Sequence, residues 1–320
     1  MSEQLAKFVA GGCGEVEAAL RRGLPVSSLP GAKRLNDALD YAVFPGGKRL
    51  RPALALLASG LAGASREQGL AVACAVEFLH SSSLILVDLP SMDDASFRRN
   101  RRALHLVFGE GVAVLASIAL LNQSYALLAG AAQTRDGGGG ACAGGALVRE
   151  VARCIGSDGM VGGQVVDLET RAGARDTDAL ACRDLKTVAL MRLMMTAGAL
   201  ACGAHDDDTR ALADFGDCFG RAYQICDDVL DEAHLSEVTG KPARQDARHL
   251  RVSATVTLGP EGARRFARQL ITRGVARLSE QFGAREEVSL LADAAYYVLD
   301  ASGEACALGA KTHAREQAIA

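Results

Sequence analysis

The chain has 320 residues, of which 49% are hydrophobic and 23% charged, enough to bury a sizeable core and unlike fibrous or disordered proteins. Its 35 Lys and Arg against 38 Asp and Glu give a formal net charge of −3. Because no basic excess is present to hold a polyanion, we expect no nucleic-acid partner. Aromatic residues make up only 4%, without any Trp. Strands favour aromatic and β-branched residues, so this composition predicts an all-α protein.

Targeting and redox signals are weak. Nine cysteines show no CxxC or Cys/His ligand spacing, so we expect neither a disulfide framework nor a zinc site. The first twenty residues lack the basic start and apolar core of a signal peptide, which favours a cytoplasmic location. Residues 111–134 carry no charge, but polar residues interrupt the middle of the stretch. We therefore expect a buried central helix there and no transmembrane segment.

Hydrophobic periodicity indicates helices along most of the chain. The Gly-rich segment 136–145 predicts a surface loop between two of them. No repeat or linker stands out, so a single domain over residues 1–320 is expected. Apolar residues recur every three or four positions over 50–62, 66–89, 103–133, 147–171, 178–203, 208–232 and 260–282.

The first candidate site residues stand before the helix expected from residue 50. Gly46 and Gly47 form a turn, and Lys48 and Arg51 are three residues apart, so they share a helix face. A helix N-terminus also offers backbone N–H groups. This segment is therefore a plausible anion site, although glycine-lysine turns are common.

An acidic cluster and a basic run follow the helix 66–89. The acidic cluster includes Asp88 and Asp93, and it is followed by four Arg residues within 98–102. Taken alone, the basic run fits a solvated surface equally well. Directly after an acidic cluster it is better explained as a clamp for phosphate oxygens, which Arg binds bidentately. His80 is either an ordinary core histidine or part of the same cavity.

The strongest local pattern is an acidic pentad in the helix 208–232. Asp227 and Asp231 are four residues apart and lie on one helix face, with Asp228 beside them. Like charges at this spacing repel unless a cation neutralises them. The pattern fits either a solvated acidic helix end or a Mg²⁺ site that shares its ligands with substrate phosphates.

The order of the motifs GGKRLRP, LHSSSLILVDLPSMDDASFRR, HLVFGE, GGQVVDLE, LKT and YQICDDVLD resembles the trans-isoprenyl diphosphate synthases. Residues 79–125 are most similar to bacterial geranylgeranyl diphosphate synthases. The resemblance implies the isoprenoid synthase fold, a bundle of long helices around a central apolar cavity. It also implies a homodimer, or a heterodimer with a paralogue, and Mg²⁺-dependent condensation of isopentenyl diphosphate with an allylic diphosphate.

The resemblance further implies residue roles. It places the isopentenyl diphosphate site at Lys48, Arg51, His80 and Arg99. Around the allylic diphosphate it places Arg98, Lys186, Thr187, Gln224 and Lys241. The matching metal-binding aspartates are Asp88, Asp93, Asp227, Asp228 and Asp231. The expected catalytic set is Asp88, Asp93, Arg98, Lys186 and Asp227.

Product length is expected to depend on the helix one turn before the first acidic cluster. Ser82 and Ser83 are small, whereas an aromatic side chain there would close the cavity at fifteen carbons. The resemblance thus predicts a twenty-carbon product, geranylgeranyl diphosphate. The alternative is that Ser82 is merely a tolerated helix residue and that the cavity floor lies elsewhere.

One departure from the family pattern keeps other functions open. Val87 stands where the family has the first aspartate of its first metal motif. The retained isopentenyl diphosphate residues favour an elongating synthase. The alternatives are a terpene synthase derived from this fold, which would ionise one long diphosphate, and a non-catalytic or regulatory subunit.

Overall fold

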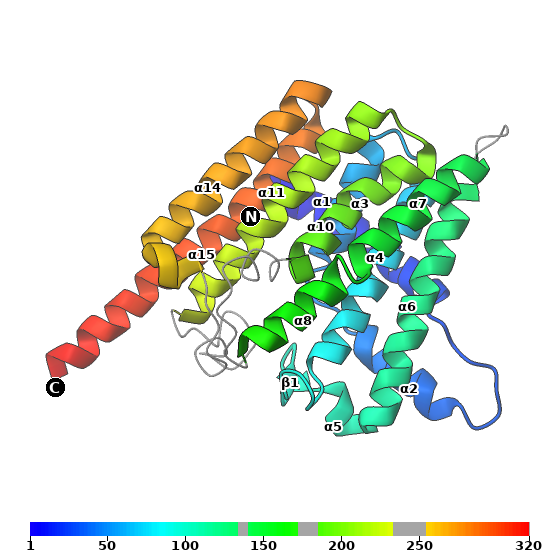
Figure 1. Cartoon of the computed structure of the whole chain (residues 1–320), viewed down its shortest axis with the longest axis horizontal. Coiled ribbons are helices and arrows are strands. Elements are labelled where there is room, and N and C mark those ends of the chain that lie inside the picture. The colour runs from blue at the N-terminus through cyan, green and yellow to red at the C-terminus, as the bar shows by residue number, and fades with distance from the viewer. Residues whose placement is uncertain (134–139, 172–184, 233–253, 320) are drawn as a thin grey trace. The chain divides into compact units, whose positions relative to one another are not determined.

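The computed structural model describes residues 1–133, 140–171, 185–232 and 254–319, and α-helices form nearly all of its secondary structure. The prediction of an all-α protein is confirmed. The strands in the described residues are a short pair, β1 (Phe97–Arg98) and β2 (Arg101–Arg102). The helices appear in Figure 1 in chain order: α1 (Glu3–Gly23), α2 (Lys33–Val43), α3 (Leu50–Leu61), α4 (Arg66–Val87), α5 (Leu104–Phe108), α6 (Glu110–Gln133), α7 (Gly140–Ile155), α8 (Met160–Arg171), α10 (Leu185–Cys202), α11 (Asp206–Glu232), α14 (Ala254–Phe282) and α15 (Glu286–Ile319).

The residues group into two compact units by their contacts. The first, here the N-terminal unit, comprises Glu3–Ala152 and Leu193–Arg210. The second, the C-terminal unit, comprises Met1–Ser2, Arg153–Arg192 and Ala211–Ala320. Because both units take separate stretches of the chain, the division does not follow chain order, and the expectation of a single domain stays a prediction.

Helix α4 is the centre of the N-terminal unit and packs against α3 and α6. A capping box starts it: the Ser65 hydroxyl accepts a hydrogen bond from the Gln68 backbone N–H, and the Gln68 side chain accepts one from Ser65 N–H. Gly198 lets α10 pack closely against α3, since a Cβ there would lie 2.1 Å from the Ser59 hydroxyl of α3. The start of α4 is thus determined by specific side chains, and the contact between α3 and α10 by a glycine.

In the C-terminal unit, α14 and α15 lie side by side (Figure 1). Phe215 and Phe219 of α11 are buried and stack with 5.8 Å between ring centroids. A Cβ at Gly274 of α14 would lie 3.0 Å from the Cys218 Cβ, so this glycine lets α14 approach α11 closely. An aromatic stack on α11 and a glycine on α14 therefore contribute to the core of this unit.

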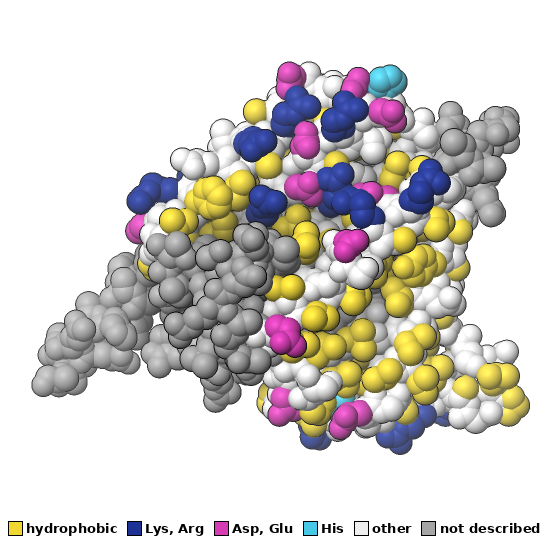
Figure 2. All heavy atoms as spheres, viewed as in Figure 1, with side chains coloured by type: hydrophobic (Ala, Val, Ile, Leu, Met, Phe, Trp, Pro, Cys, Tyr) yellow, Lys and Arg dark blue, Asp and Glu magenta, His cyan; other side chains and the backbone are white. Residues whose placement is uncertain are grey.

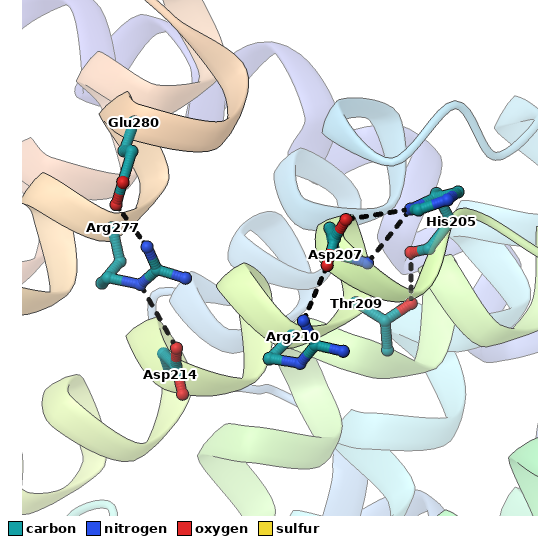
Figure 3. A network of polar contacts seen from close by, with 7 residues as sticks. All are labelled: His205, Asp207, Thr209, Arg210, Asp214, Arg277 and Glu280. Carbon is teal, nitrogen blue, oxygen red and sulfur yellow. Dashed lines mark hydrogen bonds and ion pairs between the residues drawn. The ribbon is translucent and has the colours of Figure 1, made fainter.

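Figure 3 shows two surface networks, one in each unit. In the C-terminal unit, Arg277 pairs with Asp214 at 3.4 Å and with Glu280. In the N-terminal unit, Arg210 donates to Asp207 at 2.7 Å. These side chains are exposed, and exposed ion pairs contribute only about 0.2–1 kcal/mol each, so we assign them no functional role.

Several predicted helix boundaries are wrong for local reasons. The helix expected over 103–133 is divided into α5 and α6 at Gly109, whose φ is 82°. The helix expected over 147–171 is divided into α7 and α8, and a Cβ at Gly159 would lie 2.2 Å from the Cys154 carbonyl. In the expected loop 136–145, residues 140–145 instead form the start of α7. The helices α1, α2 and α15 were not predicted.

Helix α6 is not the buried central helix that the sequence predicted. Leu115 is 59% exposed and Ile118 54% exposed, and Figure 2 shows hydrophobic side chains along this helix. Among the described residues, α4, α6 and α10 are long and apolar enough to cross a membrane by length and composition. In α4 and α10 most of that apolar stretch is buried, and in α6 only 33% is. One side of α6 is thus an exposed apolar face.

Candidate functional site

The three cations of the glycine-lysine motif at the start of α3, Lys48, Arg49 and Arg51, lie in different environments. Arg49 is 4% exposed, has φ 50°, and donates to the carboxylates of Glu17 and Glu77 at 2.5 Å each. Gly46 makes room for it, since a Cβ there would lie 1.9 Å from the Arg49 Cζ. Lys48 is exposed and Arg51 is half-buried. The buried member, Arg49, was not singled out by the sequence analysis.

The basic run 98–102 lies in a β-hairpin that has a two-residue turn. Strands β1 and β2 pair antiparallel, with Arg98 opposite Arg101. The turn residues Arg99 and Asn100 have φ values of 51° and 60°. Two positive φ values in a two-residue turn are the type I′ pattern, and Asn is among the residues that adopt this conformation most readily. The hairpin therefore holds each arginine of the run at a defined place.

These arginines have different partners. Arg101 stacks over the Tyr41 ring at 3.6 Å and donates to the Phe44 carbonyl at 2.8 Å. Arg99 is half-buried, with its Nη2 3.6 Å from Glu77. Burial, together with the nearby Arg49, Arg51 and Arg98, lowers the pKa of Arg99 although Glu77 opposes this. Burial is the largest cause of this shift, and repulsion by the neighbouring arginines adds to it.

In the first acidic motif, the Asp88 carboxylate is bound by a side chain of the same unit. Asp88 is 3% exposed, and Arg98 Nε donates to both of its carboxylate oxygens at 3.1 Å while Nη2 donates to one of them. Burial raises the pKa of Asp88, and the bonds to Arg98 only partly oppose this. Asp93 is half-buried, and its backbone N–H donates to the Val87 carbonyl at 2.9 Å. The carboxylate of Asp88 is thus neutralised by an arginine of the hairpin.

Ser82 and Ser83 lie on different sides of α4. The Ser82 hydroxyl is buried 2.9 Å from the hydroxyl of Ser117 in α6. Ser83 is half-buried and donates to the backbone carbonyl of His80 at 2.8 Å. His80 is half-buried. The predicted product-length position Ser82 is therefore a contact between α4 and α6.

A small pocket in the N-terminal unit brings together part of the predicted site. Its walls include Asp88, Arg98 and Arg99, together with Tyr41 and the hydroxyl-bearing Ser81. The Ser81 Oγ is buried and has no hydrogen-bond partner within the described part of the chain. Lys48, Arg51 and His80 do not line this pocket. The pocket thus contains the Arg98–Asp88 pair and Arg99 but not the rest of the predicted anion site.

In the C-terminal unit, α10 and α11 connect three predicted residues in one hydrogen-bonded chain. The Thr187 hydroxyl donates to the Gln224 side-chain oxygen at 2.8 Å, and Gln224 Nε2 donates to Asp228 at 3.0 Å. Gln224 and Asp228 are buried, whereas Asp227 is half-buried. Asp231 lies one turn further along α11. The side-chain amide of Gln224 therefore orients the Asp228 carboxylate.

Lys186 is held by a residue that the sequence analysis did not single out. Its Nζ lies 3.1 Å from the Asp167 carboxylate of α8, which is fully buried. A Cβ at Gly163 would lie 2.4 Å from the Lys186 backbone nitrogen, so this glycine lets α8 approach α10. Both belong to the motif GGQVVDLE, which was the available signal. Lys241 lies outside the described residues.

No three His, Cys, Asp or Glu side chains lie close enough to hold a metal ion by themselves within residues 1–133, 140–171, 185–232 and 254–319. Mg²⁺ usually takes one or two protein carboxylates and completes its shell with water and substrate phosphates. Asp93 in the N-terminal unit and Asp227 in the C-terminal unit are both half-buried, so each is suited to such an open metal shell.

Known proteins are similar to this chain over most of its length. A model of the polyprenyl synthetase family matches residues 32–282. The mitochondrial geranylgeranyl pyrophosphate synthase 6 of Arabidopsis thaliana is 37% identical over 270 residues, which cover 82% of this chain and 79% of that protein. Large subunit 2 of a heterodimeric geranylgeranyl pyrophosphate synthase from the same plant is 32% identical over 283 residues, or 87% and 72% of the two chains. The crystal structure of an FPP/GFPP synthase from Zymomonas mobilis matches with a TM-score of 0.79 and 30% identity, covering 93% of this chain and all of that one.

Proposed function

Because the chain belongs to the polyprenyl synthetase family, we propose that it is a Mg²⁺-dependent trans-prenyltransferase. Such an enzyme condenses isopentenyl diphosphate with an allylic diphosphate, and here the proposed product is geranylgeranyl diphosphate. The family match and the geranylgeranyl diphosphate synthases among the relatives support the reaction and the product. The structural observation that carries the proposal is the surplus of positive charge in the pocket of the N-terminal unit, whose walls include four arginines of the hairpin and one carboxylate, Asp88.

That surplus suits the diphosphate of the isopentenyl substrate. Asp88 pairs with Arg98, while Glu77 pairs with Arg49 and lies 3.6 Å from Arg99. The further cations at this end of α4 are Arg99 and, by sequence, Lys48 and Arg51. Arginine binds phosphate oxygens bidentately, and a diphosphate is the anion that this arrangement would hold. His80 completes the proposed isopentenyl diphosphate site.

The acidic motifs are proposed to hold the allylic diphosphate through metal. Mg²⁺, when bound, supplies positive charge that stabilises the departing diphosphate. In the C-terminal unit, the carboxylates proposed to hold metal are Asp227, Asp228 and Asp231 on α11. In the N-terminal unit, Asp93 after α4 is the proposed metal carboxylate, while the contact with Arg98 favours a positioning role for Asp88. The remaining proposed contacts to this diphosphate come from Arg98, Lys186, Thr187, Gln224 and Lys241.

Each buried contact in the C-terminal unit has a defined task in this proposal. Asp167 holds the Lys186 ammonium, and Thr187 holds Gln224, which in turn orients Asp228. Groups that are ordered before the substrate arrives stabilise developing charge without a cost of reorganisation. The apolar helices exclude water from the carbocation, for which the chemistry requires a dry environment.

We propose a twenty-carbon product because the contact between α4 and α6 is made by two hydroxyls. Ser82 and Ser117 leave this contact without an aromatic side chain, and Ser83 beside them is equally small. A prenyl tail that grows along α4 would therefore not be stopped at fifteen carbons.

We propose a dimer as the working form. The exposed apolar face of α6, with Leu115 and Ile118, is of the kind that a protein partner covers. A second copy of this chain is the expected partner. A paralogue is the alternative, since two of the relatives are large subunits of heterodimeric geranylgeranyl pyrophosphate synthases.

A product assay tests the function. The purified chain is incubated with Mg²⁺, labelled isopentenyl diphosphate and dimethylallyl, geranyl or farnesyl diphosphate, and the dephosphorylated products are sized by chromatography. A labelled twenty-carbon alcohol is expected. A hydrocarbon formed from geranylgeranyl diphosphate alone would instead indicate a terpene synthase, and absence of any reaction would indicate a regulatory subunit.

A further inference from the structure

Glu77 is a buried carboxylate that the proposed reaction does not use directly. It lies on α4 one turn before His80 and is 3% exposed. The same oxygen, Oε1, accepts a hydrogen bond from Arg49 Nη1 at 2.5 Å and lies 3.6 Å from Arg99 Nη2. A buried carboxylate is costly unless cations compensate it, and here two arginines from different segments do so.

The Arg49 side of this contact is rigid. Besides Glu77, Arg49 donates from Nε to Glu17 of α1 and from Nη2 to the Val43 carbonyl at 2.8 Å. Burial favours loss of its proton, but Glu17 and Glu77 outweigh this and raise the pKa of Arg49. Since three of its nitrogens are engaged and the Gly46 backbone closes over it, Arg49 holds the Glu77 carboxylate in one place.

The contact between Glu77 and Arg99 is longer than the contact between Glu77 and Arg49. At 3.6 Å the contact is an ion pair beyond hydrogen-bonding distance, so Glu77 attracts the guanidinium without taking up its N–H donors. Arg99 stands at the hairpin turn with positive φ, and its neighbours Arg49, Arg51 and Arg98 repel it. An opposing carboxylate is therefore needed to keep the Arg99 side chain at this position before an anion binds.

We propose that Glu77 is a positioning residue that, held by Arg49, sets the Arg99 guanidinium for the diphosphate of isopentenyl diphosphate. The inference rests on the proposed function, because it assigns Arg99 to that substrate. Glu77 itself touches no substrate, and its effect passes through Arg99.

Calorimetric binding of isopentenyl diphosphate and of inorganic diphosphate to the full chain tests this role without requiring turnover. Glu77→Gln is expected to weaken both about tenfold, the size of one charge-assisted contact. In an Arg99→Gln background the same substitution is expected to change binding less than about twofold, because a residue that acts through Arg99 loses its effect when Arg99 is absent. Glu67→Gln, an exposed carboxylate on the same helix, is the matched control and is expected to change nothing.

A second variant distinguishes weaker binding from loss of folding. Glu77→Asp keeps the negative charge opposite Arg49 but shortens the side chain, so it should fold as the unmodified chain does and weaken binding several-fold. An equal effect of Glu77→Gln in both backgrounds would overturn the proposal, as would unchanged binding by both Glu77 variants. If the unmodified chain binds isopentenyl diphosphate but forms no product, the proposed function fails while the double substitution still decides the role of Glu77. If it binds neither ligand, both proposals fail.

Discussion

The two acidic motifs contrast in what holds their carboxylates. In the N-terminal unit, Asp88 is bound by the cation Arg98 through both oxygens. In the C-terminal unit, Asp228 is bound by the neutral amide of Gln224. An arginine cancels a carboxylate's charge, whereas an amide orients it and leaves the charge in place. Under the proposed function, we expect Asp88 to act through Arg98 at the diphosphate and the carboxylates of α11 to contribute negative charge for metal.

The largest effect is expected from Asp227→Asn, which removes one negative charge from the half-buried acidic face of α11. We expect kcat to fall about 1,000-fold, or about 4 kcal/mol of transition-state stabilisation, because metal-held diphosphate is the leaving group. Steady-state kinetics with Mg²⁺ measures this. Asp214→Asn, an exposed position on the same helix, is the control and should retain activity within about twofold. A loss below tenfold for Asp227→Asn would argue against α11 as the metal-binding helix.

Arg98→Met tests the other half of the contrast through stability. It leaves the buried Asp88 without its cation, which should lower the free energy of unfolding by about 3–5 kcal/mol. Arg102→Met, an exposed cation of the same hairpin, should cost less than about 0.5 kcal/mol. Urea unfolding of both variants measures the difference. Similar values for the two would mean that the Arg98–Asp88 pair is not a structural element.

The same pair predicts a pH dependence. Because the pKa of Asp88 is raised in the folded chain, the folded state keeps this proton at pH values where the unfolded state has lost it. The contribution of Asp88 to stability is therefore greatest at low pH and falls as pH rises above the ordinary carboxyl range. The fall should be steeper in Arg98→Met, since the cation that partly opposes the shift is gone. Unfolding free energies at pH 4 to 7, compared with those of Asp88→Asn, would measure it.

Val87→Asp would restore the missing carboxylate at the end of α4. We expect kcat to rise about tenfold at limiting Mg²⁺, because a second carboxylate beside Asp93 strengthens metal binding by about 1.4 kcal/mol. Val87→Asn has nearly the same shape without the charge and should give no gain. A gain of equal size in both variants would trace the effect to polarity at this half-buried position and not to metal.

Ser82→Phe is expected to change the product with a smaller effect on rate. The ring would enter the contact with Ser117 between α4 and α6 and shorten the main product from twenty to fifteen carbons. Overpacking should cost about 1–3 kcal/mol of stability. Ser117→Ala, which removes the hydroxyl partner without adding volume, should leave the product unchanged. An unchanged twenty-carbon product from Ser82→Phe would place the cavity floor elsewhere.

Helix type and approximate position could be predicted from periodicity, but the breaks could not. Gly109 interrupts a continuous apolar pattern through a positive φ, and Gly159 does so through close backbone contact. Such steric requirements carry no periodic signal. The exposed face of α6 was missed for a related reason, because an apolar helix has the same composition whether it is covered by its own chain or by a partner.

The motifs predict which residues belong to the site, and the structure adds how those residues are held. The Arg run was ambiguous until the two positive φ values at Arg99 and Asn100 showed a hairpin. Pairing across segments, as between Arg49 and Glu77 or Lys186 and Asp167, depends on helix packing that one sequence does not display. These partners lie in motifs already noted or one turn from them, so proximity to a motif was the available signal.

Binding with and without Mg²⁺ tests the contrast between the motifs most directly. Calorimetry would compare isopentenyl diphosphate with a non-ionisable thio analogue of farnesyl diphosphate, using the unmodified chain and Asp227→Asn. Isopentenyl diphosphate is expected to bind equally well in EDTA and in Mg²⁺, and to both proteins. The allylic analogue should bind only with Mg²⁺ and only to the unmodified chain. Isopentenyl diphosphate binding that requires Mg²⁺ and is lost in Asp227→Asn would contradict this expectation.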